Sequence, residues 1–138
     1  MNIAIVGATG NVGRKTLEVF DKKNFKFENL YLVASEKSAG KKITFRNKEY
    51  EIENLETYDF SKANITFFAA GGKIAEKYAE NAAKHTIVID NSSFFRMDPD
   101  VPLIVPQVNS SDIKKMKKNI IANPNCSTAQ LVIALKPL

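Results

Sequence analysis

The stretch that decides the fold is Gly7-Ala8-Thr9-Gly10-Asn11-Val12-Gly13. It follows an apolar run at residues 3–6 and precedes residues 12–20, whose apolar positions have helical spacing. The three glycines are spaced like a dinucleotide-binding fingerprint with one extra residue between the first two. One glycine permits a backbone angle that side chains forbid, one lets a pyrophosphate approach the backbone, and one lets the helix pack against the strand. The phosphates would then lie at the helix N-terminus. The alternative is a tight strand-to-helix turn without a ligand.

Strand and helix patterns alternate along the rest of the chain. We expect strands at residues 30–33, 65–70, 86–90 and 119–122, and helices at residues 74–84 and from about residue 127. Residues 41–52 alternate around Arg46-Asn47-Lys48, which predicts a hairpin. Residues 101–108 lie among three prolines and predict an extended segment with one short strand. The pattern predicts an α/β fold, a Rossmann-like doubly wound and mostly parallel sheet with a small hairpin insertion.

Composition describes an ordinary globular domain. The 138 residues are 44% hydrophobic and 25% charged, with a net charge of +5. A nucleic acid could explain the excess, but so could an anionic cofactor with an anionic substrate, and we expect neither nucleic acid nor membrane as a partner. The only lysine run, residues 114–118, is typical of a solvated helix face. One cysteine allows no internal disulfide, the first residues do not resemble a signal peptide, and no apolar stretch approaches the roughly 20 residues of a membrane span. We therefore expect a cytoplasmic protein.

The end of the second predicted strand bears on the choice of cofactor. NAD enzymes usually place an acidic residue there for the ribose hydroxyls. Here the chain offers Ser35, Lys37 and Ser38, which can bind a 2′-phosphate, against Glu36, which could pair with the ribose. Two hydroxyls and an ammonium favour NADP. The alternative is a polar surface turn. We expect no metal.

Cys126 lies where a strand ends and a helix begins, at the sheet edge where ligands of open parallel sheets bind. A helix N-terminus favours a thiolate, although a lone cysteine is more often a small buried hydrophobe. Asn125 could donate to an oxyanion through its amide. Arg96 follows another strand at this edge and could clamp a phosphate or carboxylate, or simply cap the loop. His85, the only histidine, is expected at the opposite, amino edge.

Five ordered motifs together closely resemble the aspartate-semialdehyde dehydrogenases: residues 7–13, 35–40, 90–98, 105–109 and 123–128. The resemblance implies that Cys126 is the acyl-thioester nucleophile, assisted by Asn125, and that Arg96 binds phosphate. It implies NADP binding by the following residues: Gly7, Thr9, Gly10, Asn11, Val12, Gly13, Ser35, Lys37, Ser38 and Gly71. Gln107 and Lys37 are mild departures, since many members carry glutamate and arginine there.

The resemblance also implies an activity and a domain division. Residues 1–125 would form the NADP-binding domain, and residues 126–138 would open a catalytic and dimerisation domain that supplies a histidine, a glutamine and a substrate-binding arginine. The reaction would be reversible, NADP-dependent reductive dephosphorylation of L-aspartyl 4-phosphate to L-aspartate 4-semialdehyde and inorganic phosphate, in the biosynthesis of lysine, methionine, threonine and diaminopimelate, by a homodimer. The 138 residues alone would be inactive. Two alternatives remain: N-acetyl-gamma-glutamyl-phosphate reductase, which Asn125 and Ser127 disfavour, and a non-catalytic NADP-binding module.

Overall fold

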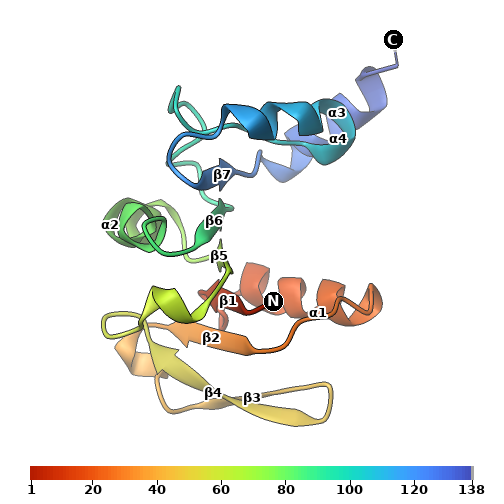
Figure 1. Cartoon of the computed structure of the whole chain (residues 1–138). Coiled ribbons are helices and arrows are strands. Elements are labelled where there is room, and N and C mark those ends of the chain that lie inside the picture. The colour runs from red at the N-terminus through yellow and green to blue at the C-terminus, as the bar shows by residue number, and fades with distance from the viewer. Residues whose placement is uncertain (138) are drawn as a thin grey trace.

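A seven-stranded sheet forms the centre of the computed structural model, which describes residues 1–137 (Figure 1). The strands are β1 (Ile3–Val6), β2 (Leu30–Ala34), β3 (Lys42–Phe45), β4 (Lys48–Asn54), β5 (Ile65–Phe68), β6 (Ile87–Asp90) and β7 (Ile120–Ala122). The helices are α1 (Asn11–Lys22), α2 (Gly72–Ala82), α3 (Pro106–Asn109) and α4 (Cys126–Leu135), with 3₁₀ turns at Glu36–Ser38, Phe60–Lys62 and Ser110–Lys115. The strand order is β3-β4-β2-β1-β5-β6-β7, and every pair is parallel except β3 with β4. The predicted Rossmann-like α/β fold is confirmed.

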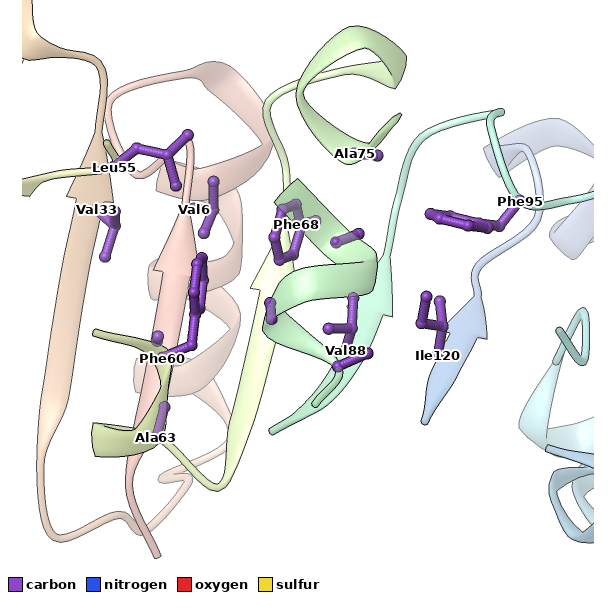
Figure 2. Close-up of a cluster of buried hydrophobic side chains, with 14 of the residues drawn as sticks. Val6, Val33, Leu55, Phe60, Ala63, Phe68, Ala75, Val88, Phe95 and Ile120 are labelled. Atoms are coloured by element: carbon purple, nitrogen blue, oxygen red, sulfur yellow. The ribbon is translucent and has the colours of Figure 1, made fainter. Parts of the chain in front are cut away.

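The two faces of the sheet carry separate hydrophobic cores. Alternate residues of β1 point to opposite faces, as the period of a strand requires: Ile3 and Ile5 pack with α1, and Ala4 and Val6 lie in the core that contains α2. Figure 2 shows this second core, where Phe68 and Val88 lie beside α2. β1 is buried on both faces and β2 almost entirely so, which is why both are continuous apolar runs.

The predicted hairpin is present as β3 and β4. Arg46 and Asn47 form its two-residue turn, with φ angles of +50° and +60°, the positive pair that a tight antiparallel turn needs. The Arg46 guanidinium donates to the carbonyls of Phe20 (2.5 Å) and Phe25 (3.0 Å), at the end of α1. This contact fixes the hairpin against the first helix.

The expectation of a short strand within residues 101–108 is wrong. Only one bridge forms there, between Leu103 and Ala122, and the chain turns into α3 at Pro106. Proline lacks the N–H that a strand ladder needs, and its fixed φ suits the first residue of a helix. Asn109 closes the turn, since its side chain accepts from the Val105 N–H at 2.8 Å.

The lysine run is largely exposed to solvent, as expected, but it does not form a helix face. It begins in the last residues of a 3₁₀ turn and continues into a loop. Lys115 pairs with Asp112 (2.7 Å), Lys117 with Asp100 (2.7 Å), and Lys118 with both Asp98 (3.0 Å) and Glu80 (3.2 Å). Three of these carboxylates are distant in sequence, so the run itself could not reveal them.

Two apolar surfaces are not covered by other parts of residues 1–137. Beside α1, the face of β5 and β6 borders a hollow of about 680 Å³ whose walls include Val19, Phe67 and Ile89. Helix α4 has no buried residue, and Leu131 and Leu135 are 57% and 51% exposed. Within residues 1–137, no helix is both long and apolar enough to cross a membrane.

Candidate functional site

The three glycines of the first loop have different structural roles. Gly7 has φ +86°, and a Cβ there would lie 2.8 Å from the Ala69 carbonyl. A Cβ on Gly13 would lie 2.3 Å from the Gly7 oxygen, so the helix could not pack as it does. At Gly10 the nearest atom would be 3.4 Å away, and φ is −78°. Gly7 and Gly13 are therefore required by the fold, whereas Gly10 leaves open space beside the loop.

The N-terminus of α1 is free to meet an anion. Its N-cap is Gly10, which supplies no side-chain hydrogen bond, and its first turn carries no acidic residue. The first amides of a helix have no partner within the helix. Gly7, Thr9 and Gly10 border a hollow of about 400 Å³, which Ser35 and Ala70 help to line. This site fits the pyrophosphate of a dinucleotide, because it combines uncapped amides, the positive end of a helix and a glycine beside empty space.

The turn after β2 reaches the same part of the molecule. Ser35 precedes the 3₁₀ turn Glu36–Ser38, which closes when the Ser38 N–H donates to the Ser35 carbonyl at 2.8 Å. Ser35 and Lys37 are exposed and border a second hollow, of about 430 Å³, together with Glu36. The hydroxyl and the ammonium therefore border open space, as binding of a 2′-phosphate requires.

Gly71 lies at the carboxyl end of β5, where that strand passes into α2. Its φ is +87° and it is the N-cap of α2. A Cβ there would meet nothing within 4 Å, so the backbone angle, and not crowding, calls for glycine. Its neighbours Ala69 and Ala70 line the hollow beside the first glycine loop.

Cys126 is the first residue of α4 and its side chain is exposed. Asn125 is the N-cap: its Oδ1 accepts from the Ser127 N–H at 2.9 Å. The cap uses the carbonyl half of this amide, so the NH₂ half is the part that can donate to an oxyanion. The thiol thus stands at the positive end of a helix, in contact with solvent.

Arg96 connects the ends of two strands. It donates from Nε to the carbonyl of Asn123 (3.0 Å) and from Nη2 to the carbonyl of Asn91 (3.2 Å). The two asparagines also bond to each other, Asn123 Nδ2 to Asn91 Oδ1 at 2.9 Å. These bonds hold Arg96 beside the turn that leads to Cys126, and Nη1 makes no hydrogen bond within residues 1–137. Sequence reasoning missed the asparagine pair, although each asparagine directly follows its strand.

The turn that carries Arg96 is shaped by a buried carboxylate. Asp90, the last residue of β6, is 0% exposed and accepts from the N–H (3.1 Å) and the hydroxyl (2.6 Å) of Ser92. The Ser92 hydroxyl oxygen then accepts from the Phe94 N–H at 3.1 Å. A buried polar side chain needs such partners, and they set the path of the loop between Asp90 and Arg96.

His85 lies apart from the cysteine turn, as predicted. It is exposed, between the end of α2 and the start of β6, at the amino end of the parallel strands. Cys126 follows β7 and lies at their carboxyl end. His85 is therefore not placed to exchange a proton with the thiol.

Comparison with known proteins agrees with this geometry. Residues 2–116 match the family model described as semialdehyde dehydrogenase, NAD binding domain. The chain belongs to the semialdehyde dehydrogenase family. The match shows an NAD-binding domain of this family, and the relatives described next confirm the resemblance to the aspartate-semialdehyde dehydrogenases.

The chain is similar to several aspartate-semialdehyde dehydrogenases in both sequence and structure. It is 53% identical to the aspartate-semialdehyde dehydrogenase of Aquifex aeolicus, over 99% of the chain and 41% of that protein. The crystal structure of aspartate semialdehyde dehydrogenase II from Vibrio cholerae, complexed with ASA, has a TM-score of 0.95 at 48% identity, over 99% of the chain and 45% of its own. The enzyme of Candida albicans, solved with NADP, has a TM-score of 0.76 at 30% identity, over 99% and 46%. The chain thus spans less than half the length of these relatives.

Proposed function

We propose that this chain carries the cofactor-binding half and the nucleophile of an NADP-dependent aspartate-semialdehyde dehydrogenase. The reaction is reductive dephosphorylation of L-aspartyl 4-phosphate to L-aspartate 4-semialdehyde, and it is reversible. The observation that carries the proposal is an exposed Cys126 at the N-terminus of α4, on the sheet edge that also holds the glycine loop. The relatives are named aspartate-semialdehyde dehydrogenases, which supports aspartate semialdehyde and its acyl phosphate as the substrates.

The cofactor site divides between two elements. The amides at the start of α1 bind the pyrophosphate, and Gly7, Thr9 and Gly10 line its path. Ser35 and Lys37, which border the second hollow, and Ser38, whose N–H closes the turn, bind the 2′-phosphate that distinguishes NADP from NAD. When bound, NADPH supplies a hydride to the carbonyl carbon next to the cysteine sulfur.

The cysteine turn performs the acyl transfer. The Cys126 thiolate attacks the carbonyl of aspartyl 4-phosphate, a C–S bond forms, and the C–O bond to phosphate breaks with its electron pair on the leaving phosphate. Arg96 binds that phosphate through the part of its guanidinium that makes no other hydrogen bond. The Asn125 NH₂ donates to the oxygen that becomes negative. Reduction of the thioester and cleavage of the C–S bond then release the aldehyde and regenerate the thiolate.

The acid–base group comes from outside residues 1–138. His85 is at the other end of the strands, and positioned proton transfer is worth roughly 10²–10⁴-fold in rate. We therefore propose that residues 126–138 open the catalytic and dimerisation domain, that the whole enzyme is a homodimer in the cytoplasm, and that the 138 residues bind NADP but turn over no substrate.

The test is NADP reduction in the presence of aspartate semialdehyde and phosphate. It is run on the 138-residue chain and on a fusion of this chain with the part of the Aquifex relative that the chain does not match. We expect turnover only in the extended protein, and Cys126→Ser should abolish it while NADP binding persists. Equal rates in the two proteins, or turnover by the serine variant, would refute the proposed roles.

A further inference from the structure

The hollow beside the glycine loop continues into the hollow beside Lys37. The two share three lining residues, Ser35, Leu55 and Ile74. One end carries the loop where the pyrophosphate would lie, and the other carries charged groups. Leu55 and Ile74 provide the apolar walls that a flat, weakly polar ring such as adenine prefers.

The far end of this hollow contains a cation that sequence reasoning did not find. Lys77 and Tyr78, in the second turn of α2, line it together with Glu56. The Lys77 ammonium lies 4.9 Å from the centre of the Tyr78 ring. Interaction with the Tyr78 side chain, and more weakly with Glu56, raises the pKa of Lys77, so its positive charge is favoured.

Lys37 and Lys77 share a second property. Within residues 1–137, neither ammonium has a carboxylate oxygen within 4.0 Å, although Glu36 and Glu56 line the same hollow. Most of the lysine run, by contrast, is engaged in ion pairs. Both ammonium groups are therefore available to an incoming anion.

We propose that Lys77 is a second cation for the 2′-phosphate of NADP, supplied by α2 while Lys37 comes from the turn after β2. The adenine then lies between Leu55 and Ile74. This inference rests on the proposed NADP site. Charge supports it: with Lys37 alone, Glu36 and Glu56 would leave the hollow net negative and would repel a phosphate dianion. With Lys77 the four side chains balance, and the phosphate meets two ammonium groups.

The experiment uses two probes that differ only in the 2′-phosphate: 2′,5′-ADP and 5′-AMP. Their dissociation constants are measured by calorimetric titration of the 138-residue chain and its variants. Lys77→Ala should weaken 2′,5′-ADP about threefold to fivefold, the size of an exposed ion pair, and leave 5′-AMP unchanged. Lys77→Arg should restore binding, and the difference should shrink as salt is raised.

Lys73→Ala is the matched control, because Lys73 is exposed on the same helix and does not line the hollow. It removes the same charge and should leave both probes unchanged. If Lys73→Ala and Lys77→Ala weakened 2′,5′-ADP equally, the cause would be the general field of the positive charges, and the inference would be overturned. It would also be overturned if Lys77→Ala left the affinity for 2′,5′-ADP unchanged, or if it weakened 2′,5′-ADP and 5′-AMP equally. A wild-type chain that binds neither probe nor NADP would refute the proposed cofactor site itself. Circular dichroism verifies that each variant is folded.

Discussion

The glycine loop makes a prediction that separates folding from cofactor binding. In Gly13→Ala, the new Cβ would lie 2.3 Å from the Gly7 oxygen and 2.8 Å from Ala8 Cα, and both are backbone atoms that cannot turn away. Inserting a methyl group into a packed site costs about 1–3 kcal/mol. At about 3 °C per kcal/mol for a domain of this size, the melting temperature should fall by roughly 3–10 °C. NADP binding should fall as well, because the start of α1 must move.

Gly10→Ala is the contrasting change. Its Cβ would be 3.4 Å from the nearest atom, and its φ of −78° suits alanine. Alanine is a poorer N-cap than glycine, but it also restricts the unfolded chain, and the two effects are each below about 1 kcal/mol and opposite in sign. Thermal melting should therefore change little, whereas NADP affinity should fall at least tenfold, because the methyl group occupies the space of the pyrophosphate. Unchanged NADP affinity in Gly10→Ala would show that the pyrophosphate does not lie against this glycine.

Three further predictions concern the rest of the chain. Cys126 should react with iodoacetamide at pH 7 faster than free cysteine, because it is exposed at a helix N-terminus; a slower rate would make it a structural residue. Leu131 and Leu135, one turn apart on the same side of α4, are 57% and 51% exposed, so the 138-residue chain should self-associate, and Leu131→Glu should reduce its sedimentation coefficient; an unchanged value would show that this face is not involved. The Asp100 N–H and then Lys118 lower the pKa of Asp98. Its stabilising effect should be present above the unfolded-state pKa of about 4 and be lost as pH falls through the lower folded-state pKa. Asp98→Asn should flatten thermal stability across that range, and an identical profile for both proteins would contradict this.

Local patterns predicted most of the sheet, and the features that they missed have both local and distant causes. The strands β1, β2 and β6 are apolar runs, and residues 41–52 alternate around Arg46-Asn47-Lys48, so the strands and the hairpin could be predicted from neighbouring residues. The helix at Pro106 does have a local signal, a proline at its first position and an asparagine three residues later, and the expectation of a strand did not use it. Nothing local marks Lys77, since it reaches the hollow beside Lys37 only when α2 packs on the sheet.

The candidate site divides in the same way. Cys126, Arg96 and the glycines each follow a strand, and the carboxyl ends of parallel strands share one edge, so topology predicted that they would lie there. The hydrogen bonds between Asn91 and Asn123 depend on the register of β6 with β7, which no sequence pattern expresses.

We propose that this chain binds NADP through the glycine loop and selects it over NAD by its 2′-phosphate. The most direct test is calorimetric titration of the wild-type chain with NADP and with NAD in the same buffer, at low and physiological salt. We expect saturable one-site binding of NADP, clearly tighter than that of NAD, with a preference that narrows as salt screens Lys37. Equal affinity for the two cofactors, or tighter binding of NAD, would refute selection of NADP by its 2′-phosphate.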